Sequence, residues 1–305
     1  MGSRVQRAGV DGRFGRARPR DARSQGGTVT VREALRDAHA TLAIAGCGTP
    51  RLDAEVLLAH ALGVRRERVA LDGGLTLAAP VKRAFQQLLR RRAVEREPVA
   101  YIVGRRSFRR LELDVDARAL VPRPETELLV EVALTLDPGA RVLDLGTGSG
   151  AVALALKDER GDLQVSGSDI SSLALELAAA NGRRLGLDIS WLRADLLRGV
   201  PDEFDALVAN LPYVAERERV GLAPEISRHE PLTALMAGPD GLASIRALLA
   251  QVPAHRRVQM LALEVGAGQA PGVARMMTDA GFGSVRAERD LAGVERVVVG
   301  ERVRA

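Results

Sequence analysis

The chain has 305 residues, 46% of them hydrophobic, so it can bury the core of one large domain and a smaller one. It has no apolar run of the roughly 18 residues that a membrane-spanning helix needs, and no apolar N-terminal core of a secretory signal. Cys47 is the single cysteine, which excludes an intrachain disulfide and a thiolate metal cluster. We therefore expect a cytoplasmic protein without a metal site, and a monomer.

The net charge of +5 lies entirely in residues 1–27. This segment has seven arginines and two aspartates, whereas the rest of the chain has 37 basic and 37 acidic residues. Because the segment is rich in Gly and Arg and poor in apolar residues, it is predicted to be a disordered basic tail. The tail could contact RNA through its charge, but a non-functional extension or an upstream start-site assignment is favoured for it. The balanced charge of the remainder argues against any other direct contact with nucleic acid.

Residues 28–96 are predicted to form a small helical domain. Thr30 and Glu33 have capping-box spacing, and apolar residues follow them on a helical period. A second helix is expected to start with Pro50 in its first turn, where proline is well tolerated. A third helical pattern covers residues 80–96.

Residues 97–122 alternate between apolar and polar from Val99 onward, which predicts a β-hairpin linker. Strand patterns then alternate with helical ones through residues 123–305, and helices are expected over Ser172–Leu185 and Gly241–Ala250. Such alternation predicts an α/β domain with a parallel sheet covered on both faces and a ligand beyond the carboxyl ends of the strands. The expected strands are Ala140–Leu145, Leu163–Asp169, Ile189–Leu192, Ala206–Ala209, Val258–Glu264, Ser284–Ala287 and Val294–Val299.

The first strand of this region runs into a glycine-rich loop of Gly146, Thr147, Gly148, Ser149 and Gly150. Glycines let the backbone turn sharply and approach a ligand at the positive end of the following helix. The loop also fits the dinucleotide pattern, so a nicotinamide oxidoreductase stays open. Asp144, two residues before the first glycine, suits a cationic or amine-bearing cofactor better than a pyrophosphate.

Acidic residues follow the next two strands. Asp169 ends the second strand, 19 residues after Gly150, where a carboxylate can accept both hydroxyls of a ribose. Asp195 and Leu196 follow the third strand and are expected to meet the edge and the face of an adenine. The alternative role for these acids is loop or helix capping. The pattern predicts a nucleoside cofactor.

The fourth strand is followed by Asn210, Leu211, Pro212 and Tyr213. This segment resembles the motif of amino-methyltransferases, which reads Asn or Asp, Pro, Pro and an aromatic residue. The Asn210 side-chain oxygen and the Leu211 carbonyl can accept the two N–H groups of a planar amide or amine, and Tyr213 can stack on it. Leu211 stands where proline is usual, but Pro212 still favours an extended backbone before it.

The chain from residue 28 to 300 resembles the release factor glutamine methyltransferases. The segments that carry the resemblance are Pro50–Glu55, Glu97–Gly104 with Phe108, Val121–Glu127, His229–Pro231 with Ala234 and Leu235, and Asp290–Gly293 with Arg296. It implies a seven-stranded Rossmann-like class I methyltransferase fold with a small N-terminal helical domain. It also implies methylation of the side-chain amide (N5) of the glutamine in the Gly-Gly-Gln loop of peptide chain release factors, a step that belongs to translation termination.

The resemblance further implies S-adenosyl-L-methionine as the cofactor. Gly146–Gly150, Asp169 and Asn210 would then meet the cofactor, Asn210–Tyr213 would hold the glutamine, and the helical domain would recognise the release factor. His229 has no second histidine at metal spacing, so a loop-ordering role is favoured for it.

Three other functions stay open at this point. The same four-residue motif, here Asn210–Tyr213 and called the tetrad below, serves adenine-N6 methyltransferases of nucleic acid, although these need a basic groove. A binding module that keeps the cofactor fold without catalysis, and the nicotinamide oxidoreductase named above, are the other two.

Overall fold

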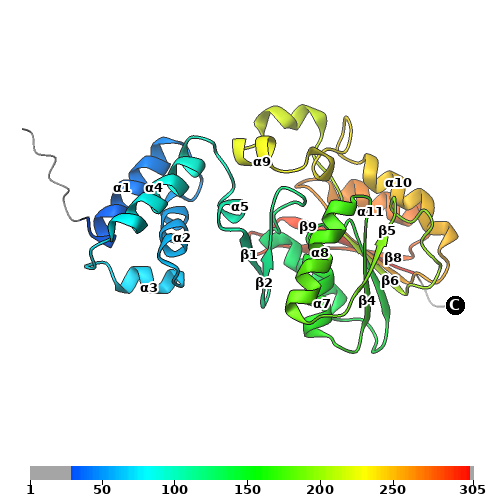
Figure 1. The fold of residues 1–305 in the computed structure, drawn as a ribbon. Coiled ribbons are helices and arrows are strands. Elements are labelled where there is room, and N and C mark those ends of the chain that lie inside the picture. The colour runs from blue at the N-terminus through cyan, green and yellow to red at the C-terminus, as the bar shows by residue number, and fades with distance from the viewer. Residues whose placement is uncertain (1–28, 303–305) are drawn as a thin grey trace, which may run out of the picture.

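The computed structural model describes residues 29–302, and the predicted basic tail, residues 1–27, lies outside this range. In Figure 1 a group of helices at the N-terminal end is joined through a short helix and a hairpin to a larger body built around a sheet. No helix in residues 29–302 combines the length and apolar character needed to cross a membrane.

The N-terminal helices begin where the local signals predict. At the first helix the Thr30 hydroxyl accepts the Glu33 N–H and the Glu33 carboxylate accepts the Thr30 N–H, so the predicted capping box is confirmed. Pro50 is the first residue of the second helix, as expected. A six-residue helix that periodicity did not predict lies between the second and third patterns. The four helices are α1 (Val31–Ile44), α2 (Pro50–Leu62), α3 (Arg66–Leu71) and α4 (Ala79–Ala93).

The linker is only partly a hairpin. The expectation of extended backbone from Val99 is wrong, because residues 99–103 form the helix α5 (Val99–Val103). Pro98 precedes its first turn, and Gly104 ends it in the left-handed conformation with φ of 74°. Strands β1 (Arg105–Phe108) and β2 (Leu111–Asp114) then pair antiparallel.

The larger body contains a seven-stranded sheet with the order β5-β4-β3-β6-β7-β9-β8. The expected all-parallel arrangement is wrong at one strand, since β9 runs antiparallel to both of its neighbours. The reason is the short turn at Asp290–Val294 between the last two strands, which can join only antiparallel neighbours. The strands are β3 (Arg141–Leu145), β4 (Gln164–Asp169), β5 (Ser190–Arg193), β6 (Ala206–Ala209), β7 (Met260–Glu264), β8 (Ser284–Arg289) and β9 (Glu295–Glu301).

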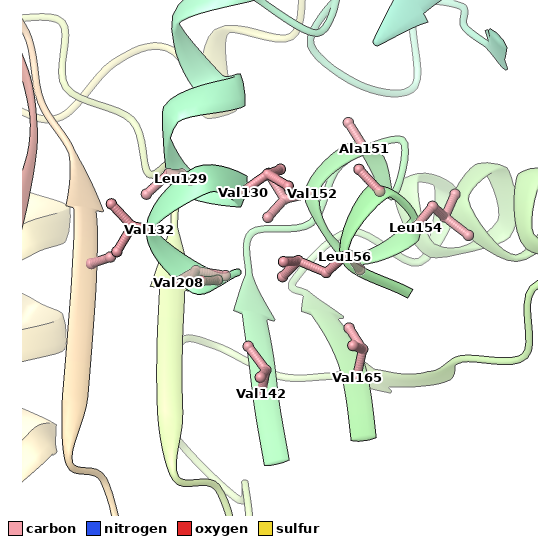
Figure 2. Close-up of a cluster of buried hydrophobic side chains, with 14 of the residues drawn as sticks. Leu129, Val130, Val132, Val142, Ala151, Val152, Leu154, Leu156, Val165 and Val208 are labelled. Atoms are coloured by element: carbon pink, nitrogen blue, oxygen red, sulfur yellow. The ribbon is translucent and has the colours of Figure 1, made fainter. Parts of the chain in front are cut away.

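Both faces of the sheet are covered by helices. Side chains alternate along each strand, so Val142 of β3 packs with one buried cluster and Leu143 with the other. Figure 2 shows the first cluster, in which side chains of α6 and α7 meet valines of β3, β4 and β6. Helices α10 and α11 cover the opposite face. The helices of this body are α6 (Glu127–Ala133), α7 (Ala151–Glu159), α8 (Ser172–Leu185), α9 (Pro224–His229), α10 (Ala243–Gln251) and α11 (Ala270–Asp279).

The strand order reverses between β3 and β6, which are neighbours in the sheet. From β3 the chain moves outward through β4 to β5, and from β6 it moves the other way to β7. Ligands in open α/β sheets bind beyond the carboxyl ends of the strands at such a reversal. A ligand site is therefore expected at the loops that follow β3, β4, β5 and β6.

The segment between β6 and β7 also contacts the N-terminal helices, as the position of α9 in Figure 1 indicates. Glu225 of α9 accepts hydrogen bonds from Arg92 at 3.1 Å and from Arg96 at 2.6 Å. Arg92 also pairs with the buried Asp53 of α2 at 2.7 Å. These ion pairs connect the N-terminal helices to the segment that follows the tetrad.

Short 3₁₀ helices also occur within residues 29–302. They are η1 (Pro124–Thr126), η2 (Glu216–Gly221), η3 (Leu232–Ala234) and η4 (Val252–Ala254).

Candidate active site

A cavity of about 600 Å³ opens at the carboxyl ends of β3, β4, β5 and β6. It brings together most of the residues that the sequence singled out, although they come from four separate loops. The predicted site residues that line it are Asp144, Gly146, Thr147, Gly148, Ser149, Asp169, Asp195, Leu196, Asn210, Leu211 and Pro212. Gly150 and Tyr213 do not line it.

The glycine-rich loop turns sharply at three positions. Gly146, Gly148 and Gly150 have φ angles of 69°, 56° and 83°, which side-chain-bearing residues rarely adopt. Gly150 directly precedes α7, and a Cβ atom there would lie about 3 Å from Leu154, Ala178 and Trp191. Gly150 therefore serves close packing of the loop against α8 and β5, while the first two glycines border the cavity.

Asp144 fixes the conformation of the glycine-rich loop through hydrogen bonds. Its Oδ2 accepts a hydrogen bond from the Thr147 hydroxyl at 2.6 Å and from the Ala153 N–H at 3.2 Å. The side chain is buried, and this burial raises the pKa of the carboxyl to about 7. The residue expected to meet an amine-bearing cofactor thus lines the cavity and also holds the loop in its turn.

Asp169 presents a fixed carboxylate at the end of β4. Its Oδ2 accepts the Gly148 N–H at 3.0 Å and its Oδ1 accepts the Ser171 N–H at 2.9 Å. Burial raises the pKa of this carboxyl as well. Each carboxylate oxygen has a second lone pair, so the group can still accept the hydroxyls of a ligand in the cavity.

The loop after β5 is held in an unusual backbone conformation. Leu196 has a φ of 55°, which costs a residue with a Cβ atom about 1 kcal/mol or more. Asp195 is exposed and pairs with Arg198 at 3.1 Å. Both predicted residues line the cavity, and backbone strain of this kind concentrates at functional sites.

Asn210 follows β6 directly and is oriented by a residue that the sequence did not single out. Its Nδ2 donates a hydrogen bond to the Thr126 hydroxyl at 3.0 Å. Thr126 is buried at the end of η1 and lines the same cavity. With Nδ2 turned toward Thr126, the side-chain oxygen of Asn210 is left as an acceptor for a ligand.

Tyr213 points to a second buried acid instead of lining the cavity. Its hydroxyl lies 3.3 Å from Oε1 of Glu264, the last residue of β7, and burial raises the pKa of the phenol. Glu264 is 2% exposed, and burial raises its pKa to about 7 although the Thr126 and Tyr213 hydroxyls lower it. The signal that could have found Glu264 is the one that identified Asp169: an acid that ends an apolar strand.

Two further residues beside the cavity carry opposite charges. Arg123 lines the cavity and pairs with Glu230 at 2.6 Å, and the Glu230 side chain is only 1% exposed. This contact joins the start of the α/β body to the segment after the tetrad. His229, the residue before Glu230, places its Nε2 atom 2.8 Å from the Glu95 carbonyl oxygen, as expected for a residue that orders a loop.

Comparison with known proteins identifies the family. The profile described as PrmC N-terminal domain matches residues 33–104, and the profile described as methyltransferase small domain matches residues 123–229. The chain is 41% identical over 253 residues to the release factor glutamine methyltransferase of Gloeobacter violaceus, with 80% of this chain and 88% of that one covered. It is 42% identical over 271 residues to the protein of the same name from Xylella fastidiosa, with 86% and 96% covered.

Among solved structures, the catalytic domain of hMettl16 is similar in fold, with a TM-score of 0.51 and 12% identity over 76% of this chain and 86% of that chain. At this identity the likeness concerns the arrangement of sheet and helices alone. The sequence relatives carry the assignment, because they match across both the helical part and the sheet. The chain therefore belongs to the release factor glutamine methyltransferase family.

Proposed function

We propose that this protein transfers a methyl group from S-adenosyl-L-methionine to the side-chain amide nitrogen (N5) of the glutamine in the Gly-Gly-Gln loop of peptide chain release factors. The observation that carries the proposal is the orientation of Asn210, whose Nδ2 is bound to Thr126. Its side-chain oxygen is therefore left as an acceptor beside the cavity, which is what a substrate N–H requires. The names of the relatives support the choice of substrate.

The lining of the cavity fits this cofactor. The Asp169 carboxylate, held by two backbone N–H groups, suits the hydroxyls of a ribose, and the Gly146–Ser149 loop allows a close approach. Ile170 and Leu173 line the cavity while 62% and 53% exposed, so a nucleoside would cover two apolar side chains. When bound, S-adenosyl-L-methionine supplies an electrophilic methyl group on a positively charged sulfur.

The residues of the tetrad would make an amide nitrogen reactive. Such a nitrogen is a poor nucleophile because its lone pair is delocalised. Acceptance of its two N–H groups by the Asn210 side-chain oxygen and the Leu211 carbonyl orients the nitrogen and favours the positive charge that builds on it. The nitrogen becomes strongly acidic once methylated, so the excess proton can leave to water without a dedicated base.

The second candidate is adenine-N6 methylation of nucleic acid, which uses the same tetrad. It receives less support, since residues 28–305 carry as many acidic as basic residues and a phosphate backbone is bound through an excess of positive charge. Because release factors act during translation termination, the proposed reaction takes place in the cytoplasm.

Mass spectrometry of a release factor before and after incubation with the protein and S-adenosyl-L-methionine tests the proposal. The expected result is a gain of one methyl group on the loop glutamine. A release factor with alanine in place of that glutamine is the matched control and should gain none. Parallel incubations with tRNA and DNA separate the second candidate, and label that enters nucleic acid alone would refute the proposal.

A further inference from the structure

We infer that Thr126 and Glu264 are positioning residues that set the orientation of the Asn210 side-chain amide. The consequence for catalysis rests on the function proposed above, in which the Asn210 oxygen accepts an N–H of the substrate. The orientation itself is a property of the protein alone.

The three side chains come from distant segments that the sheet brings to one edge. Strands β6 and β7 are parallel neighbours with Ala209 opposite Leu263, so the residues that follow each of these positions lie side by side. They are Asn210 and Glu264. Thr126, 84 residues before Asn210 in the chain, reaches the same edge from the turn that precedes α6.

A threonine hydroxyl alone would not choose between the two orientations of an asparagine amide. It has one proton to donate and two lone pairs, so it can donate to Oδ1 or accept from Nδ2. An ionised carboxylate only accepts. The Thr126 hydroxyl lies near the Glu264 carboxyl and favours its ionised form. Once this carboxyl is ionised it attracts the hydroxyl proton, and the Thr126 oxygen is left to accept from Asn210. Nδ2 therefore faces Thr126 and Oδ1 faces the cavity.

The same carboxyl holds the other end of the tetrad. Tyr213 donates its hydroxyl to Oε1 of Glu264 at 3.3 Å, while Oε2 is buried and meets no donor at full hydrogen-bond geometry within residues 29–302. The charged groups that act on this carboxyl are Glu125, which disfavours its ionisation, and Arg296, which favours it. Arg296 forms its ion pair with Asp290 instead, at 2.9 Å.

The buried carboxylate of Glu264 destabilises the folded protein. It forms no ion pair in the described part of the chain, and a buried carboxylate without a cation opposes folding. A glutamine or an apolar residue at the end of β7 would avoid this cost. The carboxylate has a use that these residues lack, since it accepts hydroxyl protons and never donates one when ionised.

The variant Thr126→Val keeps the shape of the side chain and removes the hydroxyl. We expect its kcat for methylation of a release factor to fall by about 10- to 100-fold, as is typical when a residue that orients an active-site group is lost. KM for the release factor and the cofactor affinity should stay within about threefold. Thr126→Ser keeps the hydroxyl and should return kcat to within about threefold of wild type. The matched control is Thr135→Val, which removes a hydroxyl bound only to the Val132 carbonyl.

Equal kcat for Thr126→Val and wild type would overturn the inference. An equal loss in the Val and Ser variants would do so too, since the hydroxyl would then not be the active feature. A wild-type protein that methylates no release factor would refute the proposed function instead, and that result is visible before any variant is compared.

A readout independent of activity is the side-chain amide of Asn210 in ¹H–¹⁵N NMR spectra of the wild-type protein, assigned with the variant Asn210→Asp. We expect one Nδ2 proton to exchange slowly with solvent, and to exchange faster in Thr126→Val and Glu264→Gln. Rapid exchange in the wild type, or no change in either variant, would exclude the orientation inferred here even if a variant were too unstable for kinetics.

Discussion

The replacement Glu264→Gln tests whether this buried carboxyl opposes folding. Burial raises the pKa of Glu264 from its ordinary value of 4.5 to about 7 in the folded protein. Between these pH values the folded state holds a proton that the unfolded state has released. The stabilising contribution of the protonated group is therefore fully present below pH 4.5 and is lost as the pH rises through about 7. The difference between the two pKa values corresponds to about 3 kcal/mol.

A glutamine side chain does not titrate, so the stability of the variant relative to the wild type should increase as the pH rises. We expect the free energy of unfolding of Glu264→Gln minus that of the wild type to be about 3 kcal/mol larger at pH 8 than at pH 4.5, so the variant is relatively more stable at the higher pH. Urea unfolding followed by the fluorescence of Trp191 measures it, because this single tryptophan packs against the sheet core. Asp144 and Asp169 also have raised pKa values, but both proteins share them.

The matched control is Glu67→Gln, which removes the negative charge of an exposed glutamate on α3. It separates the effect of burial from that of net charge. A stability difference between Glu264→Gln and wild type that stayed constant from pH 4.5 to pH 8, or that favoured the wild type at pH 8, would refute the reasoning.

Three other variants test separate parts of the structure. Asn210→Ala should abolish methyl transfer and leave the calorimetric affinity for S-adenosyl-L-methionine within about threefold, because it removes the acceptor for the substrate nitrogen while the glycine-rich loop and Asp169 still line the cavity. Arg92→Ala should lower the free energy of unfolding of the helical part by about 3–5 kcal/mol, measured by circular dichroism, because Asp53 would stay buried without its cation. Gly167→Ala should destabilise the sheet by about 1–3 kcal/mol and shift the tryptophan emission, since a Cβ atom there would lie 2.5 Å from the Trp191 ring.

Each of these has a control or a contrary outcome. Unchanged turnover in Asn210→Ala would exclude the proposed role of the tetrad. Arg66→Ala is the control for Arg92, because the Arg66 side chain is 48% exposed and its ion pair with Glu55 spans 3.7 Å. Gly161→Ala is the control for Gly167, since a Cβ atom at Gly161 meets nothing within 4 Å. Equal stability of the members of either pair would contradict the packing described here.

The sequence by itself determined the elements whose signals are local. The capping box at Thr30, proline in the first turn of α2 and the apolar strands of the sheet all follow from neighbouring residues, and the structure contains them. The glycine-rich loop and the acid that ends β4 were found in the same way. They lie together because the carboxyl ends of parallel strands meet at one edge of a sheet.

Features set by partners distant in the chain were decided only by the tertiary structure. Side-chain periodicity shows which face a residue takes but not which strand lies beside it, so neither the reversed strand β9 nor the proximity of Asn210 and Glu264 could be predicted. The helix α5 arose where an alternating pattern predicted a strand, because Pro98 and Gly104 bound a turn too short for periodicity to detect. The contact between Thr126 and Asn210 depends on the order of strands in the folded sheet, a property that no local pattern encodes.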